Sequence, residues 1–280
     1  MKRWILLLVI GVMACEKKVE IEVPYAGDKI VVNSFIQPDS AIYLRVTRSQ
    51  PPGASTFPEI PDAAITFTAG NMNIPLQWQV INGKGYFVST MPAPQHVSYN
   101  IKVIAPGLDT VTASDTLPRQ PLLSQPFAQA GGNRVKFVLK DMKGWDAYQF
   151  RIYKGVMNAA NQVVLSERLQ YRFDPSYNNN FTDLITENYQ EVNFITDERF
   201  DGNEISVVMQ TRNVNVKGEY IILEVTGLTF DAFKYYKTLE LQAINDGNPL
   251  VDLNRVHSNI NKGYGILAGV NAARLQLEIK

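Results

Sequence analysis

The residue of this chain with the most specific chemistry is its only cysteine, Cys15. It ends the stretch Val12-Met13-Ala14-Cys15, in which a small residue precedes the cysteine as in a bacterial lipobox. Lys2, Arg3 and an apolar run from Trp4 to Met13 come before it, and this order is typical of a secretory signal. As a helix, the stretch from Trp4 to Ala14 rises only about 16 Å against a hydrocarbon core of about 30 Å, so it is too short to span a membrane. We therefore predict that residues 1–14 are a leader that is removed.

A lone cysteine in an exported protein has no internal disulfide partner, so its sulfur at the cleavage site is expected to carry lipid. We predict Cys15 as the lipidation site, with acyl chains such as palmitate holding the protein on a membrane. The alternative is a non-lipidated secretory signal with a chance cysteine. Residues 15–26 are rich in charge and contain Pro24, which predicts an extended tether. The acidic residues behind Cys15 resemble the surface-export signal of Bacteroidota lipoproteins.

Residue types that could perform catalysis are few. The two histidines, His96 and His257, have no partner at the spacing of a zinc site. Ser258 follows His257 directly, but adjacency in sequence is not the spatial hydrogen bond that a nucleophile needs, and no Gly-x-Ser-x-Gly motif occurs. We therefore predict no catalytic residue, no metal ligand and no cofactor, and a surface hydrolase remains an alternative.

Two further motifs have simpler structural interpretations than a ligand site. The segment Asp197–Glu204 contains four carboxylates, yet Arg199 occupies a position where a calcium loop needs Asp or Asn. An Asp-Gly hairpin turn that leads into Ile205 is the favoured interpretation. The glycine-rich stretch from 263 to 269 lacks the helix and the Lys-Ser/Thr pair of a phosphate loop. We predict a closely packed or bulged strand there instead.

The charge balance is close to neutral and argues against nucleic acid as a partner. Removing Lys2 and Arg3 with the leader lowers the basic count from 27 by two, against 27 acidic residues. There is no arginine-rich stripe and no cluster of aromatic and basic residues. The residues after Cys15 are enough for one large or two ordinary domains, with stability coming from hydrophobic cores alone.

Alternation with a period of two dominates the chain and predicts a mainly β fold. About seven short alternating segments lie between residues 27 and 117, with Asn82-Gly83 as a type I′ hairpin signal. Their spacing predicts an immunoglobulin-like β-sandwich over 27–117, although the Cys-Trp-Cys core is absent. Prolines and a Gly-Gly pair predict a linker over 118–132. Residues 133–280 are then a larger antiparallel β domain.

One segment of that second domain departs from the period of two. From Thr229 to Ala243, apolar residues recur every three positions, with Thr229 as the N-cap and Gly247 and Pro249 beyond the end. We predict a single amphipathic helix whose apolar stripe packs on the sheet; its members are Phe230, Phe233, Tyr236 and Leu239. The stretch from 174 to 191 shows little period and predicts a long loop with a short helix around 182–189.

Several of these residues carry a resemblance to a known family. The lipobox cysteine, the Phe200-Asp201-Gly202 turn, the helix through 235–240 and above all the stretch from Ser258 to Ile266 resemble Bacteroidota outer-membrane lipoproteins of domain-of-unknown-function family 4249. The most specific element is Asn-Ile-x-x-Gly-Tyr-Gly-Ile, which begins at Asn259. Leu267 stands where the family pattern has an aromatic residue.

The resemblance implies a role and a location. Members of that family tend to be encoded beside TonB-dependent outer-membrane receptors. This implies a lipid-anchored accessory or binding lipoprotein, exposed at the cell surface, that partners such a β-barrel receptor in ligand capture, uptake or export. The family brings no catalytic residues to carry over. A structural or adhesion lipoprotein that contacts matrix or other cells is the alternative.

Overall fold

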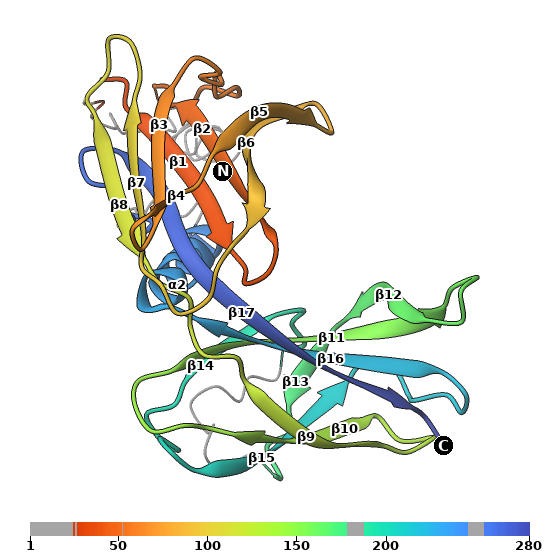
Figure 1. The fold of residues 1–280 in the computed structure, drawn as a ribbon. Coiled ribbons are helices and arrows are strands. Elements are labelled where there is room, and N and C mark those ends of the chain that lie inside the picture. Colours follow the sequence, from red (N-terminus) through yellow and green to blue (C-terminus); the bar gives the residue numbers. More distant parts are fainter. Residues whose placement is uncertain (1–24, 26, 52, 178–187, 246–254) are drawn as a thin grey trace, which may run out of the picture.

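The computed structural model describes residues 25, 27–51, 53–177, 188–245 and 255–280. Its strands form three sheets, and the helix among these residues, α2, spans Phe230–Asn245 (Figure 1). The chain is mainly β with antiparallel sheets and one described helix, as the alternating pattern predicts. None of the helices in the described part of the chain is long and apolar enough to cross a lipid bilayer.

The first half of the chain forms a two-sheet sandwich, which we call the N-lobe. One sheet has the order β1-β2-β6-β5 and the other the order β4-β3-β7-β8. A shared apolar core that includes Val32, Leu44, Phe67 and Tyr99 lies between them. The strands are β1 (Ile30–Ile36), β2 (Ala41–Arg48), β3 (Ala64–Ala69), β4 (Met72–Asn73), β5 (Leu76–Ile81), β6 (Lys84–Pro92), β7 (Tyr99–Ile104) and β8 (Val111–Asp115).

The N-lobe shares features with immunoglobulin-type sandwiches. When its eight strands are lettered A, B, C, C′, D, E, F and G along the chain, the sheets read A-B-E-D and C′-C-F-G. Tyr99, at the start of β7, donates its hydroxyl proton to the carbonyl of Pro94, as the tyrosine of such sandwiches does at the corner before strand F. Asn82 and Gly83 join β5 to β6 with φ of 51° and 74°, so the predicted type I′ turn is confirmed.

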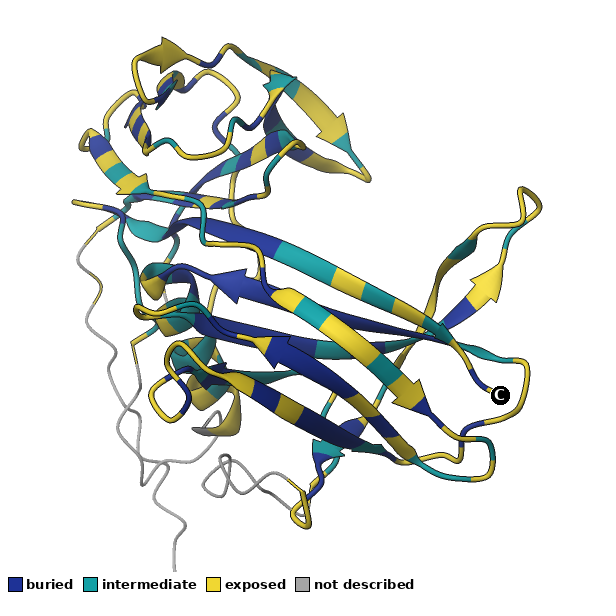
Figure 2. Ribbon diagram, turned by 60° about the horizontal axis from the view of Figure 1, so that its bottom comes forward, coloured by how far each residue is buried: buried dark blue, intermediate teal, exposed yellow. Residues whose placement is uncertain are grey.

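The second half forms another two-sheet sandwich, the C-lobe. Buried residues alternate with exposed ones along many of its strands (Figure 2). One sheet has the order β13-β15-β10-β9, and the facing sheet contains β12, β11 and β16, with β14 also pairing with β11. The strands are β9 (Leu122–Ala128), β10 (Arg134–Lys140), β11 (Ala147–Met157), β12 (Val163–Leu169), β13 (Tyr171–Phe173), β14 (Asn193–Thr196), β15 (Glu204–Thr211) and β16 (Tyr220–Leu228).

A single long strand, β17 (Tyr264–Glu278), belongs to both lobes. Its first residues pair in parallel with β1, from Val31↔Tyr264 to Ile36↔Gly269. Its remaining residues pair antiparallel with β16, from Leu228↔Val270 to Tyr220↔Glu278. One nine-stranded sheet therefore runs through the molecule, and β17 links its two halves (Figure 1). Ile260 and Leu267 also enter the N-lobe core, so residues beyond 117 complete this sandwich.

The segment 118–132, predicted as a linker, contains strand β9 and forms part of the C-lobe. β9 pairs antiparallel with β10, from Lys140↔Leu122 to Val135↔Ala128, with a shift in register between Lys136 and Val138. Pro121 precedes the strand, and Pro126 lies within it beside the shift in register. Proline at a sheet edge needs no N–H partner, which is why this proline-containing segment is still a strand.

The predicted helix is confirmed, with Thr229 as its N-cap. The Thr229 carbonyl accepts a hydrogen bond from Phe233 N at 2.9 Å, and its hydroxyl oxygen accepts one from Ala232 N at 3.4 Å. Only part of the predicted apolar stripe is buried. Tyr236 stacks between Phe35 and Phe194, whereas the side chains of Phe230 and Leu239 are 52% and 40% exposed.

Two smaller predictions have different outcomes. The predicted hairpin at Asp201-Gly202 is wrong, because the flanking strands β14 and β15 lie in different sheets. Gly202 does have φ of 72°, so the turn itself needs a glycine. Most of the short helix predicted around 182–189 lies outside the described residues, as do Gly247 and Pro249.

Candidate functional site

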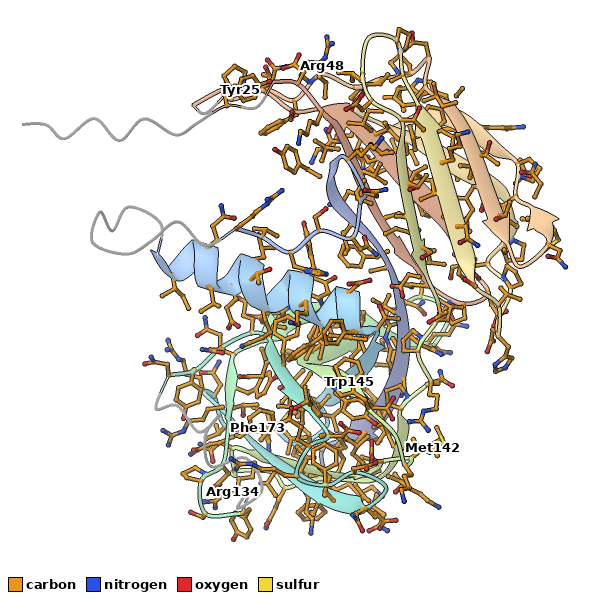
Figure 3. The ribbon with its side chains drawn as sticks, turned by 90° about the vertical axis from the view of Figure 1, so that its left-hand side faces the viewer. Tyr25, Arg48, Arg134, Met142, Trp145 and Phe173 are labelled. Atoms are coloured by element: carbon orange, nitrogen blue, oxygen red, sulfur yellow. The ribbon has the colours of Figure 1, made fainter. Side chains whose placement is uncertain are left out.

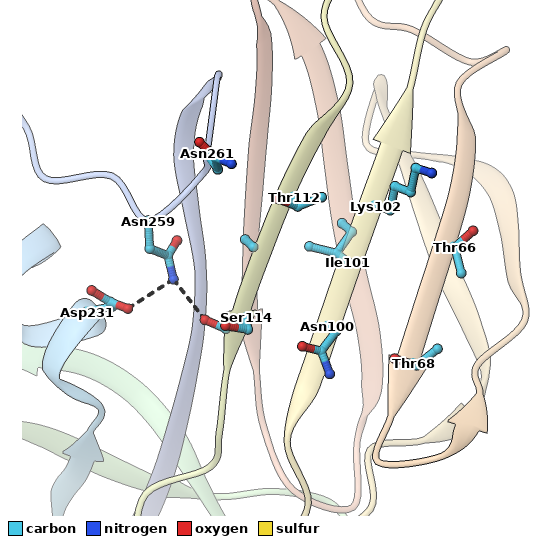
Figure 4. A pocket seen from close by; sticks show the side chains of 11 residues that line it. Thr66, Thr68, Asn100, Ile101, Lys102, Thr112, Ser114, Asp231, Asn259 and Asn261 are labelled. Atoms are coloured by element: carbon cyan, nitrogen blue, oxygen red, sulfur yellow. Dashed lines mark hydrogen bonds between the residues drawn. The ribbon is translucent and has the colours of Figure 1, made fainter.

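A groove lies where the N-lobe meets α2 (Figure 4). Its volume is about 540 Å³. The floor is the outer face of the β4-β3-β7-β8 sheet, and one wall is formed by the start of α2 and the segment before β17. The lining residues are Thr66, Thr68, Asn100, Ile101, Lys102, Thr112, Ala113, Ser114, Asp231, Asn259 and Asn261.

The floor is a grid of polar side chains set by strand register. Thr66, Lys102 and Thr112 are direct partners across β3, β7 and β8. Thr68, Asn100 and Ser114 form the next such row. Side chains alternate along a strand, and the residues between these rows turn into the N-lobe core. The side chains of each row therefore face solvent together, with neighbouring Cβ atoms about 5 Å apart.

The wall is held by the side-chain amide of Asn259, which acts as a strand partner for Leu267. Its Oδ1 accepts a hydrogen bond from Leu267 N at 3.0 Å, and its Nδ2 donates to Leu267 O at 2.7 Å. The same Nδ2 lies 3.2 Å from Asp231 Oδ2 and 3.4 Å from Ser114 O (Figure 4). Two residues on, Asn261 N donates to Thr112 O at 2.8 Å. The wall is thus tied to the floor through backbone groups.

His257 and Asp231 lie together at this wall. His257 Nε2 is 2.7 Å from Asp231 Oδ1, and Asp231 is in the first turn of α2, where the helix dipole favours a carboxylate. Among the described residues, no hydrogen bond joins Ser258 to this pair, and its Oγ accepts a hydrogen bond from Ile260 N at 3.3 Å. The other histidine, His96, is exposed in a turn with φ of 59°. The pair therefore anchors the wall.

A half-buried carboxylate, Asp115, fixes the point where the elements of the site meet. One oxygen accepts hydrogen bonds from Thr229 Oγ1 at 2.6 Å and Gly269 N at 2.9 Å, so it joins β8, α2 and β17. Burial raises the pKa of Asp115, while the hydrogen bond from Thr229 lowers it. The sequence offers no signal for this role, because each partner comes from a distant segment.

Lys102 is the charged residue of the groove that forms no ion pair with a described residue. Asp231 already bonds His257 and Asn259, whereas Lys102 forms no ion pair with any residue that the structure describes. In the strand register Lys102 lies between Thr66 and Thr112, whose hydroxyls likewise carry no described side-chain hydrogen bond. Hydroxyls, amides and one ammonium can bind a polar ligand that includes an oxyanion. The sequence alone does not indicate this grid, since β3, β7 and β8 become neighbours only in the folded sheet.

The residues best placed to hold a cation are in the C-lobe. Asp141, Asp197 and Asp201 each offer a carboxylate oxygen within 4.8 Å of the others. However, Asp141 accepts from Gly202 N at 2.7 Å, Asp197 from Asp146 N at 3.0 Å and Asp201 from Gly144 N at 2.8 Å. These bonds hold the loops between strands together, in line with the turn interpretation of this acidic segment. The sequence indicated Asp197 and Asp201 but not their partner at the end of β10.

The glycine-rich stretch lies where β17 crosses other backbone. Gly265 has φ of 98°, and a Cβ there would overlap the carbonyl of Val32. A Cβ at Gly269 would overlap the carbonyl of Thr116. The predicted close packing of this stretch is therefore confirmed. Cys15 lies outside the described residues, so its lipidation stays a prediction.

Comparison with known proteins places the chain in a family without supplying an activity. No curated protein sequence matches it. The resemblance based on the helix and the stretch from Asn259 to Ile266 agrees with a match to a family model that spans residues 16–276, whereas the lipobox lies outside the matched range. The chain therefore belongs to the family described as Domain of unknown function (DUF4249).

Proposed function

We propose that this protein is a lipid-anchored accessory protein of the outer membrane that binds a polar ligand in the groove between the N-lobe and α2. The observation that carries the proposal is the row formed by Thr66, Lys102 and Thr112, whose polar side chains face a cavity of about 540 Å³. Cys15 would carry the anchor, and residues 15–26 would tether the folded lobes to it. A TonB-dependent β-barrel receptor is the proposed partner, on the strength of the family resemblance.

The groove suits a particular ligand chemistry. Threonine and serine hydroxyls can each donate and accept, asparagine amides do both, and the Lys102 ammonium only donates. Such a surface matches a ligand rich in hydroxyl groups that also carries a carboxylate or phosphate, such as an acidic oligosaccharide. Because the groove is open and the lysine is solvated, we expect specificity from several hydrogen bonds together and only modest affinity from the charge.

Filling the groove tests the proposal. Ser114→Trp would place an indole over the polar grid, and Ser124→Trp is its matched control, because Ser124 is also exposed on an outermost strand of a four-stranded sheet. We expect the wild-type protein and the control to bind polygalacturonate, and Ser114→Trp to lose this binding while it melts at the same temperature. Equal binding by all three proteins would place the ligand elsewhere.

The anchor and the receptor have separate tests. Cys15→Ala should remove the protein from the membrane fraction and abolish its labelling by a radioactive fatty acid, and labelling that persists would contradict lipidation. A pull-down of the wild-type protein from outer membranes should bring a large β-barrel with it. If the wild-type protein is recovered without any barrel, the receptor proposal fails, whereas the ligand proposal is judged by the tryptophan variants.

A further inference from the structure

The end of the N-lobe that lies farthest from the C-lobe is where the tether enters the fold. We call it the distal end. Lys29 directly precedes β1, Ile30 pairs with Arg48 at the end of β2, and Val31 pairs with Tyr264 at the start of β17. Figure 3 shows Tyr25 and Arg48 at this end, with Trp145, Phe173 and Arg134 on the other lobe. A membrane anchor upstream of Tyr25 is therefore connected to the molecule at the distal end.

The length of the tether limits how far this end can lie from the anchor. Nine residues lie between Cys15 and Tyr25 in the sequence, and the ten residue steps from one to the other span about 35 Å when fully extended. The C-lobe attaches to the opposite side of the N-lobe (Figure 1). An acylated Cys15 thus limits the distance of the distal end from the lipid surface to about 35 Å, and the C-lobe can lie farther out.

The distal end has a cluster of cations around one tyrosine ring. Lys29 Nζ lies 5.1 Å from the centroid of the Tyr264 ring, and Arg255 Cζ lies 5.6 Å from it. Lys262, two residues before Tyr264, is exposed in a turn with φ of 62°. In the described part of the chain, these three cations form no ion pair with a carboxylate. Cations stacked on an aromatic ring remain available to phosphate.

The rest of this end agrees with an interfacial position. Asp28 is paired with Arg48, at 2.9 Å between Oδ2 and Nε, so it does not neutralise the cluster. Two exposed carboxylates, Asp62 and Asp109, lie on loops of the facing sheet. Large apolar side chains are also exposed on the loops and strand ends here; they are Tyr25, Phe57 and Ile104. Tyrosine and basic residues beside apolar tips are typical of a lipid headgroup region.

We propose that the distal end of the N-lobe lies on the lipid surface, where Lys29 and Arg255 at the Tyr264 ring, together with Lys262 in the adjacent turn, bind the phosphates of lipid headgroups. The inference rests on the proposed anchoring through Cys15 and adds the orientation of the molecule. In this orientation β17 runs away from the membrane, and the groove opens on the side of the N-lobe, where a ligand can reach it. The lipid anchor and the basic cluster then act as two membrane signals in place of one.

Lysine footprinting of the full lipidated chain tests this orientation. The protein is reconstituted in vesicles of phosphatidylglycerol and phosphatidylcholine, floated, and labelled with a membrane-impermeant amine reagent. A sample in non-ionic detergent is the reference. We expect the labelling of Lys29 and Lys262, relative to Lys136 on the C-lobe strand β10, to fall at least fivefold in the vesicles. The ratio to Lys136 cancels the fraction of molecules that face inward.

The headgroup contact has its own arm. The double variant Lys29→Gln/Lys262→Gln lacks two of the three cations but keeps the lipid anchor. We therefore expect it to float with the vesicles, and we expect the labelling of its Lys84 and Lys102 to equal the labelling of the same lysines in the wild type in detergent. Phosphatidylcholine carries a phosphate but no net charge. If the wild-type Lys29 and Lys262 are protected from labelling to the same degree in vesicles of pure phosphatidylcholine, the contact needs the phosphate and not a net lipid charge, and this result supports the proposal. A floated wild-type protein with equal labelling at Lys29 and Lys136 overturns the orientation alone. If the wild-type protein does not float with the vesicles, this contradicts the lipid anchor, and the proposed orientation is then rejected as well because it rests on the anchor.

Discussion

At the scale of residues, the crossing of β17 over the N-lobe depends on positions without a Cβ. Gly265 has φ of 98° and lies directly against the backbone of Val32, its partner in the parallel ladder. An L-amino acid there would need a strained backbone and would also overlap a carbonyl oxygen. The sequence alone suggested close packing from the density of glycines. It could not indicate which backbone lies opposite, because β1 is more than two hundred residues away in the chain.

We predict that Gly265→Ala lowers the free energy of unfolding by about 3 kcal/mol, from strain and overlap combined. Gly132→Ala is the control, because Gly132 has no positive φ and a Cβ there would meet only Gln129 O at 3.4 Å. It should change stability by less than about 0.5 kcal/mol. Chemical denaturation of both variants measures the difference. Equal stability of the two would mean that β17 does not cross β1 as closely as described.

The amide of Asn259 gives a second prediction at this scale. Asn259→Asp removes the donor to Leu267 O and puts a carboxylate beside Asp231, so we expect a loss of about 2 kcal/mol. Asn261→Asp is the matched control, because Asn261 is exposed in the same segment and contacts Thr112 through its backbone. Thermal melts at neutral pH should separate the two variants. A control that loses as much stability as Asn259→Asp would contradict the role of the side chain.

A third prediction concerns pH and Asp146, whose carboxylate pairs with Arg119 at 2.5 Å. Burial raises the pKa of Asp146 from 3.8 to about 6, although Arg119 opposes the shift. Between about pH 4 and pH 6 the folded chain keeps a proton that the unfolded chain has released, so the free energy of unfolding falls as pH rises. Asp146→Asn lacks this titration.

Denaturation of the wild type and of Asp146→Asn across that window measures the effect. We expect the stability of the wild type, relative to the variant, to decrease from pH 4 to pH 6 and then to stay level above about pH 7. Asp201→Asn, at an exposed residue of the same loops, keeps Asp146, so its free energy of unfolding should fall over this pH range as that of the wild type does. A difference between wild type and Asp146→Asn that is constant or rises with pH would contradict the account.

At the scale of elements, β17 explains why the division of the chain into 27–117, 118–132 and 133–280 does not match the sheets. Alternation correctly indicated most strands, and capping residues correctly placed α2. Neither signal carries information about which strand is a partner. β9 and β17 therefore could not be assigned to their sheets from periodicity, and Leu267 could not be assigned to the core of the N-lobe.

This shared strand leads to a prediction about fragments. A polypeptide of residues 27–117 lacks the parallel partner of β1 and the core residues Ile260 and Leu267, which are 5% and 0% exposed in the whole chain. We expect it to melt without cooperativity. The same polypeptide with residues 255–269 added through a glycine-serine linker should melt cooperatively. Calorimetry of both polypeptides measures the cooperativity of their thermal unfolding. A cooperative melt of residues 27–117 alone would contradict the prediction and show that this segment is a domain by itself.

At the scale of the whole molecule, two lobes share one sheet, and the groove lies at their junction. The N-lobe provides the floor, while α2 and the segment before β17 provide the wall. Asp115 and Asn259 bind groups from distant parts of the chain at this point. The grid of Thr66, Lys102 and Thr112 arises only when three strands align, which is why a single sequence indicated the lipid anchor but not this site.

We propose that Lys102 in this groove binds the oxyanion of a polar ligand. Isothermal titration of polygalacturonate into the wild type, Lys102→Gln and Lys136→Gln tests it most directly. Lys136 is the matched lysine, exposed at the centre of the outer face of the C-lobe sheet. We predict that Lys102→Gln raises Kd about tenfold, equivalent to about 1.4 kcal/mol, while Lys136→Gln leaves it unchanged. Equal affinities for Lys102→Gln and the wild type, or an equal loss in both variants, would contradict the claim.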